Sequence, residues 1–518
     1  MNKAVSIKDE FKSIADIFIK AMTRYPKRPA LVIEGQTWSY EELGCLIIDA
    51  ASQLRMAASD AEDRIAIIGA NHIAYIVTWW AAQFIGCSTI EIDRNESLET
   101  LLGILSKTNP RFVATDRDDL KSAIHKNIPV KLFRKFLTKC DKDQTTLMGL
   151  PGKLPFEKWQ FTRQSHKSEV VVYTSGTTAS AKGIILSQRN LCFIASTVAG
   201  YLGLNETDRC ALILPLSHTY GKSVLLSAAA VGATIVMLDS FGNRHSFLSQ
   251  LTTEKCTVLS AVPYHLHALV KSGCLRQYNL SSLKTITSSA DKLSPSTIEG
   301  LTEALPWIRI FSMYGLTEAA SRVCFVPPEM IHQKKKSCGR PLPGVELKIV
   351  AKDGRDAAVG EIGEVLLRGP NIMTGYLDNP DLTTETIVAG WLKTGDLGHL
   401  DADGFLYIDG RKKDLIKCAG ERVNPLEIEE ILMKYPDVED AAVVGRPDSL
   451  MGEIIHAYVV SGNSPLNKAD LHEHCSKRLS RNKVPYKYTI VDRLPVTSTG
   501  KVRKHFLGDT PYELTIHG

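Results

Sequence analysis

The sequence predicts an α/β fold, with a large N-terminal core of mostly parallel sheets and a small, mobile C-terminal α+β domain. Up to about residue 320, short apolar runs alternate with helical patterns, which is typical of parallel sheets covered by helices. Between residues 344 and 408, short strands punctuated by glycines indicate a compact, β-barrel-like subdomain. We therefore expect two α/β subdomains and this β subdomain in the core.

Composition and charge narrow the classes of partner. The chain has 518 residues, of which 44% are hydrophobic and 23% charged, so it is long enough for two or more cores. Its 62 basic and 57 acidic residues leave a formal charge of only +5. This weak, evenly spread charge favours neither nucleic acid nor an anionic membrane as a partner. We expect small-molecule substrates, no nucleic acid and no integral membrane segment.

The cysteines bear on the compartment, and the apolar stretches bear on whether the chain contains a signal peptide or a membrane span. The eleven cysteines are scattered, without CxxC pairs or the Cys/His spacing of zinc sites, so we expect a reducing cytoplasm rather than a disulfide framework. The first ten residues carry charges where a signal peptide needs its apolar core. The most apolar stretch, residues 65–92, is interrupted by Asn71, His72 and Gln83. It predicts a buried helix followed by a strand, not a membrane span.

Individual elements can be placed in chain order. Ser39 and Glu42 match a capping box, and apolar residues continue at helical spacing, so a helix is expected to begin there. The polar, proline-containing segment 141–167 predicts a connector. Eight apolar runs predict strands at residues 64–68, 88–92, 112–115, 170–174, 210–214, 234–238, 257–262 and 308–313.

The last hundred residues have the elements of a separate α+β unit. After the charged run 411–414, Asn424 and Pro425 predict a helix N-cap and first turn. Strands are expected at residues 441–444 and 454–460, and a helix at about 468–479. A new unit therefore begins after residue 410.

A loop at residues 173–183 has the chemistry of a triphosphate clamp. Its glycines allow the backbone to approach an anion, and its hydroxyls and lysine can bind phosphate oxygens. It is not a Walker A motif, because a glycine follows the lysine where a magnesium-binding hydroxyl is needed. On its own, the loop could equally be an ordinary polar turn. The residues concerned are Thr174, Ser175, Gly176, Thr177, Thr178, Lys182 and Gly183.

Further motifs follow the loop in a fixed order. They are Pro215-Leu216-Ser217-His218, Met313-Tyr314-Gly315-Leu316-Thr317-Glu318, Thr394-Gly395-Asp396, Gly410-Arg411-Lys412-Lys413-Asp414 with Gly420, and Leu494-Pro495-Val496-Thr497-Ser498-Thr499-Gly500-Lys501. As a set spanning nearly the whole chain, they resemble the adenylate-forming superfamily of acyl-CoA synthetases, peptide-synthetase adenylation domains and beetle luciferases. The resemblance implies ATP-dependent activation of a carboxylic acid as acyl-AMP with release of pyrophosphate. Transfer to the thiol of CoA or of a carrier-protein phosphopantetheine would follow.

The resemblance assigns a nucleotide site. Tyr314 is expected to stack on adenine beside Gly315, Thr317 to bond phosphate, and Glu318 to offer a carboxylate oxygen to Mg²⁺. Asp396 is expected to accept hydrogen bonds from the ribose hydroxyls, with Arg411 as a second ribose contact. Asp291 falls near the adenine.

The remaining roles concern the acid and the thiol. His218 could be a general base, but the resemblance favours positioning of the acid carboxylate, with Tyr220 lining the same pocket. Lys501 would stabilise the charge that develops when the carboxylate attacks the α-phosphorus of ATP. In the thiol step, Lys417 and Gly420 would face the acyl-adenylate, and Gly420 would leave room for a pantetheine arm.

The resemblance also implies the domain organisation. In the family, the small domain swings between two orientations about a residue that corresponds to Lys413. We therefore expect an N-terminal adenylation core at residues 1–410, a hinge at 411–413 and a C-terminal α+β lid domain at 414–518.

Two departures from the family pattern bear on activity and substrate. Ala179 and Ala181 stand where glycine and proline are usual, which would weaken ATP binding. Ser288-Ser289-Ala290-Asp291 stands where Gly-Gly-Ala-Pro is usual, and serines in place of the glycines would narrow or polarise the acyl pocket and suit a short, polar or unusual acid.

Three functions remain open on the sequence alone. Residues 217–231 contain no carboxylate to hold an α-ammonium group, so an α-amino acid is disfavoured. The chain could pass its acyl group to CoA or to a separate carrier protein, since no carrier domain follows Lys501. The third possibility is a weakly active adenylate binder. The retained Lys501, Glu318 and Asp396 argue against it.

Overall fold

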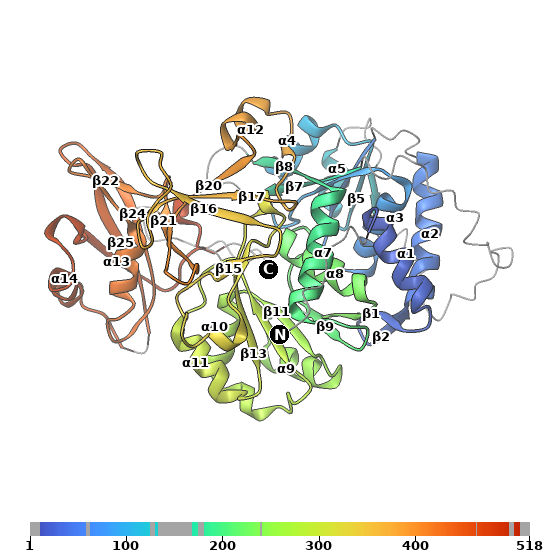
Figure 1. Cartoon of the computed structure of the whole chain (residues 1–518), viewed down its shortest axis with the longest axis horizontal. Helices are drawn as coiled ribbons and strands as arrows, with labels where there is room; N and C mark the ends of the chain where they lie inside the picture. The colour runs from blue at the N-terminus through green and yellow to red at the C-terminus, as the bar shows by residue number, and fades with distance from the viewer. Residues whose placement is uncertain are drawn as a thin grey trace. The chain divides into compact units, whose positions relative to one another are not determined.

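The structure, a computed structural model, describes residues 11–57, 63–124, 130–132, 168–174, 181–238, 241–462, 464–496 and 502–507. Internal contacts divide the chain into two compact units, whose elements are labelled in Figure 1. The first unit holds Met1–Glu346 and Arg368–Gly390, and the second holds Leu347–Leu367 and Trp391–Gly518. The expected hinge at residues 411–413 falls inside the second unit, and the domain boundaries built on it stay a prediction.

A seven-stranded sheet in the first unit has the order β18-β8-β7-β4-β3-β5-β6. Strands β7, β4, β3, β5 and β6 are parallel, whereas β8 is antiparallel to β7 and β18 to β8. The central strands are almost entirely buried, as expected for apolar runs covered on both faces. The strands are β3 (Arg64–Ile68), β4 (Ser88–Glu91), β5 (Phe112–Thr115), β6 (Val130–Leu132), β7 (Glu169–Thr174), β8 (Lys182–Ser187) and β18 (Gly375–Tyr376).

A nine-stranded sheet in the same unit has the order β15-β14-β13-β12-β11-β9-β10-β1-β2. The six strands from β13 to β1 are parallel, so the carboxyl ends of β11, β12 and β13 meet at one edge. In open α/β sheets this is the edge where ligands bind. The strands are β1 (Pro29–Ile33), β2 (Gln36–Ser39), β9 (Arg209–Leu212), β10 (Thr234–Met237), β11 (Val258–Ala261), β12 (Thr285–Ser288), β13 (Arg309–Tyr314), β14 (Cys324–Phe325) and β15 (Arg340–Pro341).

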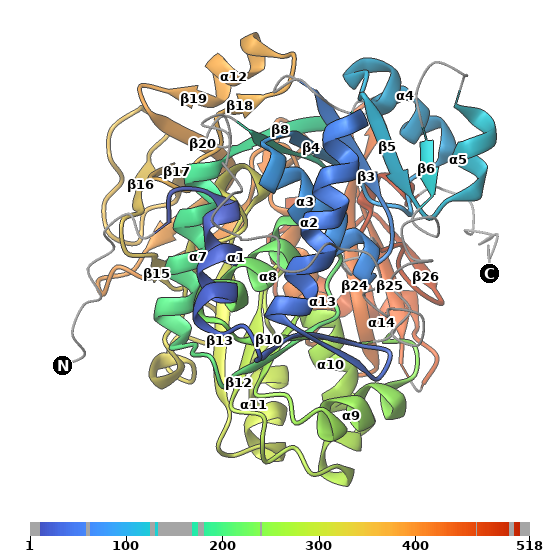
Figure 2. The ribbon, with the colours of Figure 1, turned by 90° about the vertical axis from the view of Figure 1, so that its right-hand side faces the viewer.

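Helices of the first unit cover these sheets. Helices α1 (Ile14–Arg24), α2 (Tyr40–Ala57) and α3 (Ile73–Ile85) lie side by side, as Figure 2 shows, and α7 (Gln188–Leu202) packs on α8 (Thr219–Val231). Residues 73–84 of α3 are all buried, which confirms the buried helix expected from the apolar stretch 65–92. Within the described ranges, no helix is long and apolar enough to cross a bilayer.

The second unit contains two further sheets. Strands β16 (Glu346–Val350), β17 (Gly363–Arg368), β20 (Trp391–Leu400) and β21 (Leu406–Arg411) share one sheet, as the glycine-punctuated strands predicted. The other sheet contains β22 (Ile416–Cys418), β23 (Glu421–Val423), β24 (Val438–Asp448), β25 (Gly452–Ser461) and β26 (Lys487–Val491). Ile428 of α13 (Pro425–Leu432) and Leu471 of α14 (Lys468–Ser476) share a buried cluster with Ile455 of β25.

Most of the predicted elements are present. All eight predicted strands of the core are present, with ends that differ by at most two residues. The capping box of α2 is confirmed, because Glu42 N donates to Ser39 Oγ at 3.2 Å and Ser39 N donates to Glu42 Oε2 at 2.8 Å. Asn424 caps α13 by accepting from Leu426 N at 3.1 Å. The expected connector at 141–167 lies outside the described residues.

A buried ion pair joins β4, α3 and α8. Lys222 Nζ lies 2.9 Å from Glu91 Oε2, with the two side chains 3% and 0% exposed. Trp79 Nε1 and Tyr75 OH also donate to the Glu91 carboxylate, at 2.6 and 3.0 Å. Burial lowers the pKa of Lys222 to about 8, although the Glu91 carboxylate opposes the shift. A buried pair of this kind is costly to break on one side only, because the remaining charge has no partner.

We predict that Glu91→Gln destabilises the protein by about 3–5 kcal/mol, because it leaves the Lys222 ammonium buried without a counter-charge. The double variant Glu91→Leu with Lys222→Met removes both charges and should recover most of that loss. Urea denaturation followed by fluorescence would measure both variants. A Glu91→Gln protein within about 1 kcal/mol of the wild type would contradict this role of the ion pair.

Candidate active site

The segment that precedes α8 is fixed by Asn71 and by a glycine. Asn71 Nδ2 donates to Leu214 O at 2.7 Å, and its Oδ1 accepts from Leu216 N at 2.8 Å. A Cβ at Gly221 would lie 2.4 Å from Pro215 O, so only glycine lets the first turn of α8 rest on this segment. The segment therefore delivers His218 to the N-cap of α8 in one defined position.

His218 is held by a carboxylate that was not expected from the sequence. Its Nε2 lies 3.1 Å from Asp93 Oδ2, and the two side chains are 27% and 13% exposed. Asp93 follows β4 closely and also accepts from Asn95 N at 2.9 Å. With Nε2 occupied by Asp93, the ring has a fixed orientation, which suits positioning better than proton transfer. The signal for Asp93 was its place just beyond the carboxyl end of a predicted strand.

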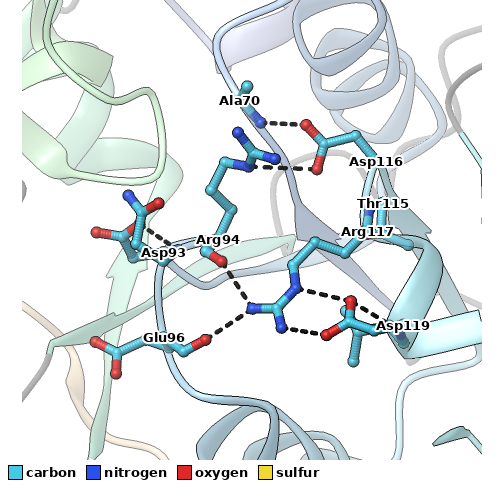
Figure 3. A network of polar contacts seen from close by, with 10 residues as sticks. Ala70, Asp93, Arg94, Glu96, Thr115, Asp116, Arg117 and Asp119 are labelled. Carbon is cyan, nitrogen blue, oxygen red and sulfur yellow. Dashed lines mark hydrogen bonds and ion pairs between the residues drawn. The ribbon is translucent and has the colours of Figure 1, made fainter. Parts of the chain in front are cut away.

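A polar network holds the turn that carries Asp93 (Figure 3). Arg117 Nη1 donates to Arg94 O at 2.9 Å and to Glu96 O at 2.7 Å, and Arg117 also pairs with Asp119. Nearby, Asp116 accepts from Ala70 N at 2.9 Å and lies 3.5 Å from Arg94 Nε. The network thus anchors both the 93–96 turn and the segment leading to Asn71, which are the two sides of the His218–Asp93 pair.

Glu318 lies in a cluster with Lys182 and Tyr376. Tyr376 OH donates to Glu318 Oε1 at 3.2 Å, and Lys182 Nζ lies 5.4 Å from the centre of the Tyr376 ring. Burial, and then the Glu318 carboxylate, raise the pKa of Tyr376 well above its usual value, so the hydroxyl stays a donor. Two predicted site residues are therefore brought together through a tyrosine that sequence reasoning missed.

The loop after β13 is tightly folded around Gly315. A Cβ there would lie 1.6 Å from Ser321 O, and Ser321 N donates to Leu316 O at 3.0 Å. Ala320 and Ser321 take φ values of +50° and +82°, a region that side chains usually avoid. Tyr314, at the end of β13, and Thr317, in the 3-10 helix η3 (Thr317–Ala319), are both half-buried. The folded loop holds these predicted nucleotide residues beside Glu318.

The departure at residues 288–291 is visible in the backbone. Ser288 and Ser289 are buried at the carboxyl end of β12, whereas Ala290 and Asp291 are exposed. Ala290 takes φ +84°, a conformation that glycine adopts more easily. Asp291 accepts a hydrogen bond from Lys292 N at 2.7 Å.

In the second unit, Asp396 and Arg411 form an ion pair. They face each other in β20 and β21, with Arg411 Nε 2.8 Å from Asp396 Oδ1. The Asp396 side chain is only 3% exposed. Lys417 and Gly420 lie on the β22–β23 hairpin, whose turn residues Ala419 and Gly420 take φ +51° and +81°. Nothing in the described residues lies within 4 Å of the Cβ position of Gly420.

Several predicted residues fall outside what the structure describes. These are Lys501 and the loop residues Ser175, Gly176, Thr177 and Thr178. The backbone of Thr174 ends β7 and pairs with Lys182 of β8, so the loop connects two antiparallel strands.

Comparison with known proteins identifies the family. Residues 18–377 match the AMP-binding enzyme family, and residues 427–501 match the C-terminal domain of AMP-binding enzymes. The 2-succinylbenzoate–CoA ligase of Bacillus subtilis is 31% identical over 484 residues, which are 93% of this chain and 95% of that protein.

Comparison with solved structures supports the same family. The Bacillus subtilis o-succinylbenzoate CoA synthetase in complex with its acyl-adenylate intermediate has a TM-score of 0.82 at 28% identity, covering 95% of this chain and 98% of that one. Its complex with ATP and magnesium ion also has a TM-score of 0.82, at 29% identity and the same coverage. The expected fold class and the expected AMP-forming ligase class, with ATP and Mg²⁺, are confirmed. The chain belongs to the AMP-binding enzyme family, the adenylate-forming family that its motifs resemble.

Proposed function

We propose that this chain is an acid–CoA ligase that activates a carboxylic acid as acyl-AMP and then transfers the acyl group to the thiol of CoA. The observation that carries this proposal is the cluster of Lys182, Tyr376 and Glu318. The cluster joins β8, the strand that follows the proposed phosphate loop, to the loop after β13. This contact supports the proposal that Lys182 binds phosphate and that Glu318 binds the metal ion in the same site of the first unit.

The first step is displacement at phosphorus. An oxygen of the substrate carboxylate forms a bond to the α-phosphorus of ATP, the bond between that phosphorus and the bridging oxygen breaks, and pyrophosphate leaves. In the second step, the thiolate sulfur of CoA bonds to the acyl carbon and AMP leaves. Both steps depend on positioning and on stabilising negative charge, more than on covalent participation of the protein.

Glu318 is the proposed metal ligand. One carboxylate oxygen accepts the Tyr376 hydroxyl, and the half-buried side chain keeps its other oxygen for a hard cation. A Mg²⁺ ion held there would neutralise phosphate charge. Thr317, Lys182 and the hydroxyls of Thr174, Ser175, Thr177 and Thr178, with Gly176, are the proposed phosphate contacts.

The other nucleotide contacts come from three places in the sequence. Tyr314 and Gly315 would form the adenine side of the site, with Asp291 nearby. Asp396 would bind the ribose hydroxyls with Arg411, which is supported by their side-by-side placement on β20 and β21.

The remaining residues are proposed to serve the acid substrate and the thiol step. His218, oriented by Asp93, would position the attacking carboxylate. Lys501 would stabilise the negative charge on the pentacoordinate α-phosphorus in the transition state. Lys417 and Gly420 would serve the thiol step after a swing about residues 411–413. The open space around the Gly420 Cβ position is consistent with access for a pantetheine arm.

Acceptor, substrate and compartment complete the proposal. CoA is favoured over a separate carrier protein because the Bacillus subtilis relative, which matches over 95% of its length, is named a CoA ligase. The acid lacks an α-ammonium group, because residues 217–231 offer it no carboxylate. We place the enzyme in a reducing cytoplasm, which ten free thiols among the described cysteines support, and expect neither nucleic acid nor a membrane as partner.

An acid-panel ATP–pyrophosphate exchange assay tests the function. We expect exchange with at least one acid, and thioester formation when CoA is added but not with a holo-carrier protein alone. Lys501→Ala should lower exchange by about 10²-fold or more while leaving the melting temperature unchanged. Acid-independent exchange, or exchange that Lys501→Ala does not alter, would overturn the proposal; a holo-carrier that outperforms CoA would reassign the acceptor.

Glu318→Gln should reduce exchange by about 10²-fold, because it weakens the metal ligand. Tyr376→Phe should cost about tenfold and shift the dependence of the rate on Mg²⁺ concentration, because Tyr376 orients Glu318. Tyr278→Phe, which removes an exposed hydroxyl bonded to His245, is the matched control and should leave exchange unchanged. A Tyr376→Phe enzyme with wild-type Mg²⁺ dependence would remove Tyr376 from the site.

Arg117→Met should raise the KM for the acid by about tenfold and leave the KM for ATP unchanged, because it frees the turn that carries Asp93 and hence His218. Arg276→Met, which breaks an exposed ion pair with Glu303, is the matched control for loss of an arginine. Steady-state kinetics with either substrate varied would separate the two KM values. Equal changes in both would indicate general loosening of the fold instead.

A further inference from the structure

A buried arginine follows the Glu318 turn and is not used by the mechanism above. The Arg322 side chain is among the largest fully buried ones, and the residue is 1% exposed. Its Nε donates to Ser223 Oγ at 3.1 Å, and its Nη1 donates to Tyr201 OH at 3.0 Å and lies 2.6 Å from Met313 Sδ. Its guanidinium carbon lies 4.5 Å from the centre of the Tyr220 ring.

All of these partners are neutral. Within the described parts of the chain, no carboxylate forms an ion pair with Arg322, and its Nη2 is buried without a hydrogen-bond partner. Arginine cannot relieve the cost of a buried, unpaired charge by losing its proton, because its pKa is too high. A buried guanidinium is stable when an anion pairs with it, so the missing partner is an anion that the described protein does not supply.

The position of Arg322 connects it to the acid side of the site. Tyr220, against which it packs, lies two residues after His218 on α8. The Tyr220 hydroxyl is fixed by Thr287, at 2.9 Å from its Oγ1, near the carboxyl end of β12. The next residue, Ser288, has a buried hydroxyl that also lacks a partner. Two buried groups without a partner therefore adjoin Tyr220: Arg322 packs on its ring, and Ser288 follows Thr287, which binds its hydroxyl.

We propose that Arg322 binds a second carboxylate on the acid substrate, with Ser288 as an additional donor. The inference rests on the proposed function and specifies its substrate class as dicarboxylic acids. One carboxylate reacts near His218 while the other pairs with the planar guanidinium. A monocarboxylic acid with an apolar tail would leave Nη2 unpaired and is disfavoured.

Paired acids of equal carbon number test the proposal: hexanoate with adipate, and 3-(2-methylphenyl)propanoate with 3-(2-carboxyphenyl)propanoate. In pyrophosphate exchange, we expect kcat/KM for the wild type to favour the dicarboxylic member by about tenfold or more. Arg322→Met should abolish this preference, and Arg322→Lys should retain part of it; neither should change the KM for ATP. Arg309→Met, at the other end of β13 and packed on Phe311, is the matched control and should keep the preference.

Two outcomes would overturn the proposal. The first is a wild-type enzyme that prefers the monocarboxylic acids. The second is an Arg322→Met protein whose rates fall equally for all acids and for ATP, which would assign Arg322 to the fold alone. Melting temperatures with each acid provide a readout independent of turnover: only dicarboxylic acids should stabilise the wild type, and none should stabilise Arg322→Met. If no acid supports exchange, the proposed function fails, whereas the melting-temperature shifts still decide whether Arg322 binds dicarboxylates.

Discussion

The buried ion pair between Lys222 and Glu91 is the constraint on which the candidate site depends. Glu91 ends β4 two residues before Asp93, and Lys222 lies on α8 four residues after His218. The same contact therefore sets the position of both partners in the His218–Asp93 pair. Trp79 and Tyr75 of α3 also donate hydrogen bonds to the Glu91 carboxylate, so the ion pair is fixed from three elements at once.

Strand ends supply most of the chemistry around this constraint. Asp93 follows β4 of the seven-stranded sheet, whereas Ser288 ends β12 and Glu318 follows β13 of the nine-stranded sheet. Parallel strands place their carboxyl ends at one edge, which lets residues distant in sequence converge. The tight turn at Gly315 and the positive φ values at Ala320 and Ser321 show that the loop carrying Glu318 has strained backbone.

Much of the fold could be predicted from the sequence, because apolar periodicity and capping residues act locally. The predicted strands and the capping box at Ser39 are examples. Several strands of the first unit, such as β1, β2, β8 and β12, were not predicted, because periodicity alone cannot distinguish a short apolar strand from a buried helix. The motifs predicted the family and named Glu318 and His218. They did not predict Tyr376, which contacts Glu318 across 58 residues of sequence, or Asp93, which contacts His218 across 125, because tertiary contacts of this length leave no local pattern.

The spacing between His218 and Lys222 has a consequence for how the chain can change. Successive residues of a helix are rotated by about 100°, so one residue inserted between these positions would turn the Lys222 ammonium away from Glu91. Connections between elements usually tolerate changes in length. The segment from Leu214 into the first turn of α8 would not, because Asn71 holds Leu214, Gly221 packs on Pro215 and Glu91 holds Lys222. Homologues should therefore vary here by substitution and hardly ever by insertion or deletion.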